Sequence, residues 1–233
     1  MTRFACLLLL ALPLGAAEKR WATSSDSRLT LGGGYAFRGA RVVPGVGLLR
    51  ESRNAVRPVP RLELSLASTS FWRTEADWRN VESRYAFALA ARPLDKLTVE
   101  AGWCYRGRLD WTGTGLSTAE VFAGARHEGP GRPSARLWYG YRAPVGAYLE
   151  CSAGHTWNLA RRVKLGVDAT VGFDPGRRVE GFHDARLRAG LPIRLWRDWH
   201  LCPQLRLVVP AARVDSGGAR LLPELSLVSG RPW

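Results

Sequence analysis

The sequence predicts an all-β protein: a closed antiparallel transmembrane β-barrel of ten to twelve strands, with twelve preferred because single-chain barrels have even strand numbers. Apolar and polar residues alternate in long segments along most of the 233 residues. The polar sides of these segments carry charges in mid-strand. Short turns (93–96 and 158–161) alternate loosely with longer connections (40–60, 109–116 and 174–179). These three features favour a membrane barrel over a soluble β-sandwich, which stays open as the alternative.

The N-terminal residues predict a signal peptide at positions 1–17. Arg3 supplies the positive start, an apolar run follows from Phe4 to Leu14, and small residues precede Glu18. The apolar run is too short to span a bilayer as a helix. We therefore expect residues 18–233 to form a single outer-membrane barrel domain after export.

The first predicted strand runs from Arg28 to about Arg38 and contains three consecutive glycines, Gly32 to Gly34. Glycines inside a strand often mark a bend, as barrel curvature requires. Residues 40–60 hold several glycines and three prolines. We expect a long loop there, or a loop with one poor strand around Val46 to Leu49.

The clearest strand is Val163 to Phe173, where odd positions are apolar and even positions are polar or glycine. Alternate side chains of a strand point to opposite faces, so one face is apolar and the other polar. Eleven segments show usable alternation: 28–38, 61–66, 85–91, 97–106, 118–126, 135–142, 147–156, 163–173, 180–190, 201–209 and 221–227.

Aromatic residues near the predicted strand ends suggest interfacial girdles, although a sandwich core would also hold aromatics. The last residue, Trp233, is an aromatic of the kind that is common at the end of outer-membrane barrels. The girdle candidates are Tyr35, Phe37, Trp72, Trp103, Tyr105, Trp111, Tyr139, Tyr141, Trp157 and Phe173.

The formal charge of +14 comes almost entirely from arginine and is open to two explanations, anion binding or a GC-rich genome. No aromatic-basic recognition motif indicates nucleic acid. Cys104, Cys151 and Cys202 are an odd number, which argues against a disulfide framework. Strand parity places Cys151 on the apolar side and the other two on the polar side.

No site for chemistry is expected, and no cofactor or metal is predicted. The four histidines show no metal-ligand spacing. Ser152 and His155 would suggest a hydrolase, but they lie three residues apart on a strand and therefore point to opposite faces. The run Gly32 to Gly34 lacks the following Lys-Ser/Thr of a phosphate-binding loop.

Two short motifs resemble a known family. Tyr35 to Gly39 reads Tyr-Ala-Phe-Arg-Gly, which is similar to the Tyr-x-Phe-Arg-Gly signature of the TorF-like porin family of bacterial outer membranes. Glu120 to Gly124 resembles a second, weaker pattern of that family. The similarity covers roughly residues 28–173. It implies an outer-membrane barrel that acts as a porin, with no defined substrate.

The polar strand faces are the best candidates for function. They carry more cations than acids, and a positive pore lining favours anions. An internal network of ion pairs that fills the barrel is the equal alternative. The expected partners are outer-membrane lipid and small solutes or ions that diffuse passively; the other hypothesis is a non-conducting barrel with a structural or surface-binding role. The pore-lining candidates are Arg38, Arg84, Glu100, Arg106, Glu120, Arg126, Arg136, Arg142, Glu150, Lys164 and Asp168.

Overall fold

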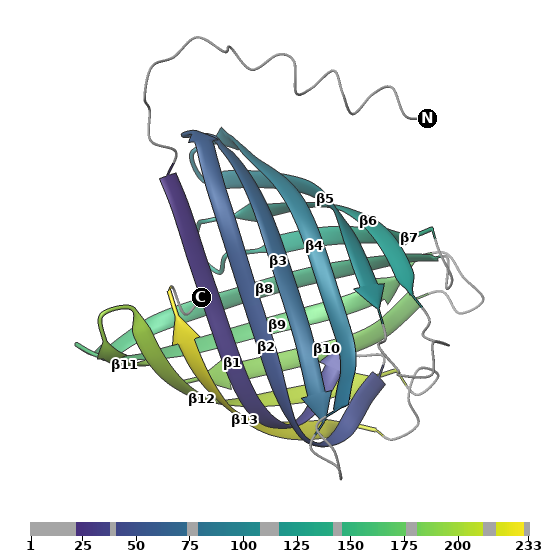
Figure 1. The fold of residues 1–233 in the computed structure, drawn as a ribbon, viewed down its shortest axis with the longest axis vertical. Coiled ribbons are helices and arrows are strands. Elements are labelled where there is room, and N and C mark those ends of the chain that lie inside the picture. The colour runs from purple at the N-terminus through teal and green to yellow at the C-terminus, as the bar shows by residue number, and fades with distance from the viewer. Residues whose placement is uncertain are drawn as a thin grey trace.

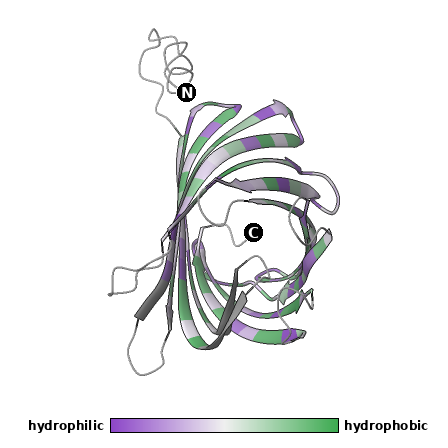
Figure 2. Cartoon of the chain, turned by 90° about the vertical axis from the view of Figure 1, so that its right-hand side faces the viewer, coloured by the Kyte–Doolittle hydropathy of each residue, from purple (hydrophilic) through white to green (hydrophobic). Residues whose placement is uncertain are grey.

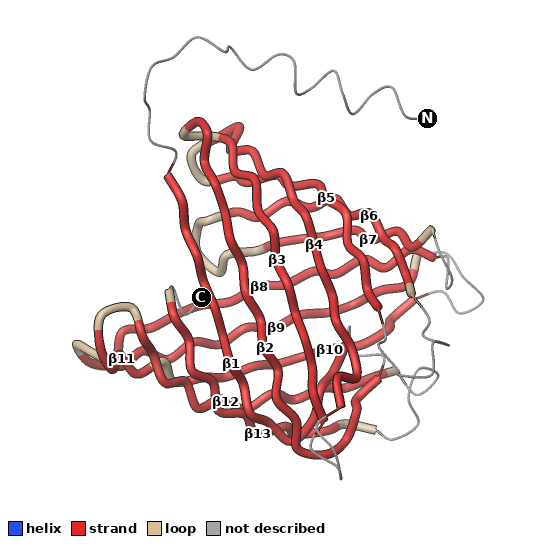
Figure 3. The backbone as a smooth tube through the Cα atoms, viewed as in Figure 1, coloured by secondary structure: helices blue, strands red, loops and turns tan. Residues whose placement is uncertain are grey.

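The computed structural model describes residues 22–37, 41–73, 79–107, 117–141, 146–175, 181–211 and 218–230. The predicted signal peptide, Trp111 and Trp233 lie outside these residues. Every regular element of the described chain is a β-strand (Figure 3). The strands are β1 (Ala22–Phe37), β2 (Arg41–Val59), β3 (Leu62–Arg73), β4 (Arg79–Leu94), β5 (Leu97–Gly107), β6 (Thr118–His127), β7 (Ser134–Gly140), β8 (Gly146–Ala160), β9 (Val163–Asp174), β10 (Gly181–Gly190), β11 (Ile193–Trp196), β12 (Trp199–Pro210) and β13 (Arg220–Ser229).

The strands form one antiparallel sheet that closes on itself (Figure 1). Apart from β10 and β11, which both lie between β9 and β12, each strand pairs with its neighbour in sequence, and β13 then pairs with β1, with Ser229 opposite Ser27. Pairing with β13 over Ser27–Gly32 closes the sheet, and the backbone groups along this seam find partners inside the sheet. The predicted closed barrel is therefore confirmed.

The segments β10 and β11 are two parts of one barrel strand. Gly190 pairs with Gly166 and Ile193 with Val163, so the register against β9 is unchanged across the break. Pro192 interrupts the strand because proline has no backbone N–H to donate. Its carbonyl still accepts a 3.0 Å hydrogen bond from the Lys164 amide. The thirteen segments thus make a barrel of twelve strands, the number preferred from the sequence.

The alternation of polar and apolar side chains along each strand explains why the polar face of the sheet lies inside the barrel and the apolar face lies outside. On β10 Leu187 is 45% exposed on the outer surface, whereas the side chains of Arg186 and Arg188 on either side are only 21% and 27% exposed. Figure 2 shows the corresponding bands of hydrophobic and hydrophilic residues along the strands. An exposed leucine face is stable only in an apolar surrounding, as lipid provides.

The connections separate the barrel into two ends. At one end, here called the short-turn end, the strands are joined through residues 60–61, 95–96, 128–133, 161–162 and 197–198. At the opposite end the connections span three to ten residues, from 38–40 up to 108–117. The predicted contrast between short and longer connections is confirmed, although the turn expected at 158–161 lies at 161–162.

The prediction of a loop over residues 40–60 is wrong. These residues form β2, the longest strand of the barrel with 19 residues. Its inward positions include Arg53 and Arg57, and its outward positions include Arg50, Ser52 and Asn54. Because both faces are polar, the alternation that reveals the other strands is absent here.

The glycines of β1 mark an irregularity, as the sequence indicates. The register against β2 shifts between Gly32, which pairs with Gly47, and Gly34, which pairs with Pro44. A shift of this kind is a β-bulge, which bends a strand and increases its twist. The bend expected at these glycines is therefore present.

Candidate lumen site

A cavity of about 730 Å³ lies inside the barrel toward the short-turn end. Its walls come from β1–β8, with Arg53 on β2, Glu63 on β3, Arg92 on β4 and Arg126 on β6. Seven arginines and five aspartate or glutamate residues line this cavity. Cations therefore outnumber acids along its walls.

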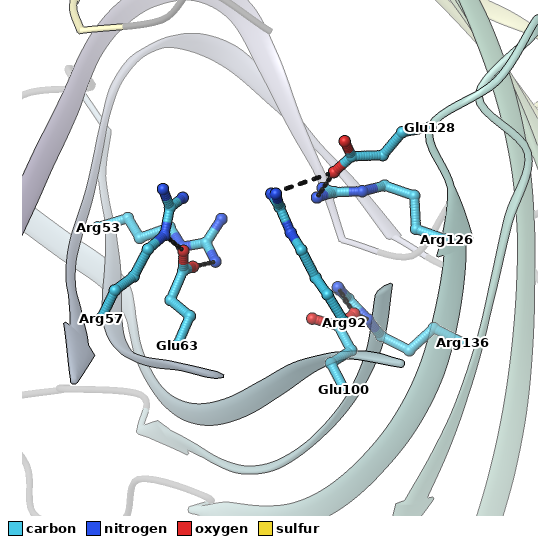
Figure 4. A network of polar contacts seen from close by, with 8 residues as sticks. All are labelled: Arg53, Arg57, Glu63, Arg92, Glu100, Arg126, Glu128 and Arg136. Atoms are coloured by element: carbon cyan, nitrogen blue, oxygen red, sulfur yellow. Dashed lines mark hydrogen bonds and ion pairs between the residues drawn. The ribbon is translucent and has the colours of Figure 1, made fainter. Parts of the chain in front are cut away.

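On the β2–β3 wall, one carboxylate binds two guanidinium groups (Figure 4). Arg53 donates a 2.6 Å hydrogen bond to Glu63 Oε1, and Arg57 donates a 2.7 Å hydrogen bond to Glu63 Oε2. The side chains of both arginines are 44% exposed. The group of two cations and one anion keeps one net positive charge that faces solvent.

A second group with the same composition comes from other strands of the wall (Figure 4). A terminal nitrogen of Arg92 and one of Arg126 each lie 3.4 Å from Glu128 Oε1. Arg92 belongs to β4 and Arg126 to β6, while Glu128 begins the turn after β6. This group also carries a net charge of one positive unit.

Several other inward-facing charges form ion pairs, and Arg186 contacts two carboxylates, those of Glu150 and Asp184. Arg136 binds Glu100, and Arg106 lies 2.8 Å from Glu82. On the opposite part of the barrel wall, two further ion pairs link neighbouring strands: Arg188 with Asp168 at 3.2 Å and Arg206 with Glu224 at 3.0 Å. Burying an unpaired charge is costly, so this pairing stabilises the interior.

An aromatic cluster occupies the inner wall beside the cavity. The rings of Phe122 and Trp138 lie 4.6 Å apart between centroids, and both are buried. The Arg84 guanidinium lies 4.6 Å from the Trp138 ring, a distance at which a cation is attracted to the ring face. Arg84 also donates a 2.9 Å hydrogen bond to the buried Sγ of Cys104. The cluster therefore holds an arginine over an apolar surface inside the barrel.

The structure sorts the sequence-predicted candidates into three groups. Arg84, Glu100, Arg126, Arg136 and Glu150 all line the cavity.

Three further candidates face the barrel interior but do not line the cavity. The remaining three lie near the end of a strand or outside the described residues. Glu120 is buried, and Arg106 and Asp168 form the ion pairs given above. Lys164 is exposed next to the turn that precedes β9. Arg38 and Arg142 lie outside the described residues.

Sequence reasoning missed four residues that form the two groups with net positive charge, namely Arg53, Arg57, Arg92 and Glu128. The first two lie on β2, which lacks an apolar face. Arg92 lies within a register irregularity between Ala91 and Leu94, but it continues the inward even positions of Ala88 and Ala90, so parity extended past Ala91 would have placed it. The signal that was present is the set of charged residues at odd positions of this segment, namely Glu51, Arg53 and Arg57.

The residues considered for chemistry are not brought together. Ser152 lines the cavity and shares a 2.6 Å hydrogen bond with Ser134. His155 is exposed on the outer face, with its ring 4.5 Å from that of Trp157. The opposite orientation expected for these two residues is therefore confirmed. Within the described ranges, no group of three or more His, Cys, Asp or Glu side chains is arranged to hold a metal ion.

The cysteines behave as their parity indicates. Cys104 and Cys202 are fully buried in the interior, and Cys151 is half-buried on the outward side of β8. All three are free thiols. No helix in the described part of the chain is long and apolar enough to cross a membrane.

Comparison with solved structures identifies the architecture. The NanC porin superposes with a TM-score of 0.55 at 10% identity, covering 89% of this chain and all of that chain. The likeness shows a shared closed β-barrel fold. The KdgM porin gives a TM-score of 0.50 at 11% identity, covering 90% of this chain and 99% of that one. No family model and no curated protein matches this chain, so the TorF-like resemblance stays a prediction.

Proposed function

We propose that the protein is an outer-membrane porin through which small solutes diffuse passively, with a preference for anions. The observation that carries this proposal is that each of two carboxylates binds two arginines. Glu63 serves Arg53 and Arg57, and Glu128 serves Arg92 and Arg126. Each group leaves one positive charge in the same cavity, and a positive pore lining favours anions.

Access to water supports conduction rather than a sealed ion-pair network at this level. The side chains of Arg53, Arg92 and Arg126 are 44%, 40% and 52% exposed. Guanidinium groups with this exposure are hydrated, so a dissolved anion can replace part of their water. Screening by salt weakens such an attraction, which makes the preference greatest at low ionic strength.

The outer surface and the N-terminal sequence support an outer-membrane location. Apolar side chains cover most outward positions, as the exposed Leu187, Leu205 and Leu225 illustrate. We propose that residues 1–17 direct export and are removed, and that residues 18–233 insert into outer-membrane lipid. Fractionation and N-terminal sequencing test this: the mature chain should start near Glu18 and require detergent for extraction. Recovery in the soluble periplasmic fraction would contradict the membrane location.

Reversal potentials in planar bilayers test the selectivity. In a potassium chloride gradient, the refolded protein should prefer chloride. Replacing Arg126 and Arg136 with glutamate should move the reversal potential toward cation selectivity. Arg161→Glu with Arg162→Glu is the matched control, because it makes the same charge change in the exposed turn before β9. An equal response of the two double variants would place Arg126 and Arg136 outside the conduction path.

A closed, non-conducting barrel with a structural or surface-binding role is the second candidate. It is favoured by the rings packed on the inner wall, since Phe122, Trp138 and Tyr148 are all less than 10% exposed. Protein that is folded and heat-modifiable but shows no conductance would support this candidate and exclude the porin.

A further inference from the structure

Among the described residues, the outer face of β1–β3 carries a row of polar side chains that is longer than any on the other strands. On β2 the outward positions Arg50, Ser52 and Asn54 follow one another, and on β3 Ser68 and Ser70 lie beside them. Ser52 shares a 2.8 Å hydrogen bond with Ser68. We call these five residues, together with Ser25 and Ser27 of β1, the polar row.

The contacts of neighbouring residues fix the outward direction of the polar row. Leu49, next to Arg50, is buried in the interior at 8% exposure. Arg53 lies between Ser52 and Asn54 and lines the inner cavity. Since alternate residues of a strand point to opposite faces, Arg50, Ser52 and Asn54 face outward.

The depth of the polar row is that of the middle of the barrel wall. Arg50 lies nine residues from each end of β2, which runs from Arg41 to Val59. Exposed apolar side chains flank the row, with Leu31 at 47% exposure toward one end and Leu66 at 53% toward the other. In a barrel that spans a membrane, this places the polar row within the hydrocarbon layer.

Contact with lipid hydrocarbon would destabilise the polar row. Hydrocarbon cannot accept a hydrogen bond, and arginine is among the most destabilising residues on the lipid face at the bilayer midplane. Some of the polar groups bond one another, as Ser25 Oγ does in donating a 2.9 Å hydrogen bond to Asn54 Oδ1. In the sheet register, however, Arg50 lies between Leu29 and Ser70, neither of which brings a charge to it.

We propose that the polar row is the contact surface with a second copy of this chain in the membrane. Two copies inserted in the same orientation have each residue at the same depth in the membrane. Their polar rows therefore lie at the same level and can contact each other. Hydroxyl and amide groups donate and accept hydrogen bonds, which makes the row complementary to itself. Arg50 of one copy then donates to Asn54 or serine oxygens of the other.

The composition of the surface favours a copy over a different protein. Among the described outward positions of β2 and β3 there is no carboxylate, and the single charge is that of Arg50. A different partner would have to bring matching polar groups to this depth, whereas a second copy already carries the same serine, asparagine and arginine side chains there. The proposal rests on membrane insertion, which is part of the proposed function, and not on conduction.

Cross-linking in lipid tests the contact. In a Cys151→Ala background the two remaining cysteines, Cys104 and Cys202, are fully buried. Ser52→Cys should then give dimers of this chain with a short bis-maleimide in native membranes. The matched control is Ala169→Cys, which is exposed on the outer side of β9 and should give none. Monomers alone from both variants, or a cross-link from Ser52→Cys only to another protein, would overturn the proposal.

Native mass spectrometry of the protein in lipid nanodiscs gives a second readout. The triple variant Arg50→Leu, Ser52→Leu and Asn54→Leu makes the surface compatible with lipid, so it should fold, remain heat-modifiable and become monomeric. The unchanged protein should be oligomeric. An oligomer that persists in the triple variant would overturn the proposal. Conductance measured on the same monomeric variant reports on the porin function separately, since a failure of one does not imply a failure of the other.

Discussion

Tyr148 on β8 donates a 2.9 Å hydrogen bond to Asp184 on β10, passing over Gly172 of the strand between them. The two residues are both buried in the interior, and Asp184 is fully so. Its second oxygen lies 2.9 Å from Arg186 Nε. Polar side-chain contacts thus link β8 to β10 across β9 inside the barrel, in addition to the backbone hydrogen bonds of the sheet.

The first prediction concerns the space over Gly172. A Cβ atom there would meet the Tyr148 hydroxyl and the Asp184 carboxylate, so Gly172→Ala should lower the free energy of unfolding by about 1–3 kcal/mol through overpacking. Urea unfolding in detergent measures the change. Adding Tyr148→Phe removes the hydroxyl and should restore part of the loss. If the double variant is no more stable than Gly172→Ala alone, the contact over Gly172 is absent.

The second prediction concerns the shared carboxylates. Glu63→Gln and Glu128→Gln each remove the one negative charge that two arginines share, so chloride selectivity should rise in both variants. Asp95→Asn is the control, since it makes the same charge change on a side chain that is 95% exposed in a turn. Reversal potentials in a salt gradient measure the effect. A shift toward cations in either glutamine variant would contradict the assigned charge balance.

The third prediction concerns the two faces of β9. Val167 lies on the outer face, so Val167→Arg should cost roughly 2–4 kcal/mol of folding free energy near the bilayer midplane. Asp168→Asn, one residue away, changes an inward side chain that binds Arg188 and should refold with a smaller loss. Folding yield into lipid vesicles compares the two. Equal yields would mean that the inward and outward faces of β9 are assigned wrongly.

Most of the fold could be predicted from the sequence because the membrane imposes a strict rule on each strand. In β9 every outward residue from Val163 to Phe173 is apolar, so alternation alone locates the strand and its faces. The rule fails for β2, where Arg50 and Ser52 replace the apolar face. The feature that concealed this strand is thus the one that we propose as a contact surface.

The candidate site was predicted only in part, for reasons of geometry. Parity within a strand correctly identifies Arg126 and Arg136 as inward residues. It cannot show that Arg126 and Arg92 approach the same carboxylate, because Glu128 lies in a turn and Arg92 lies in the irregular end of β4. Side chains from different strands meet at a depth set by strand tilt and register, which no single segment of sequence contains.

Closure of the sheet through Ser27 and Ser229 has a consequence for how the chain assembles. The first and last strands of the chain must pair with each other before the sheet closes, and until they do the sheet has two open edges. Once closed, however, the barrel has no preferred starting strand. A circular permutant that joins β13 to β1 by a short linker and opens the chain at the turn of residues 95–96 should therefore reach the same barrel, with β5 as its first strand and β4 as its last.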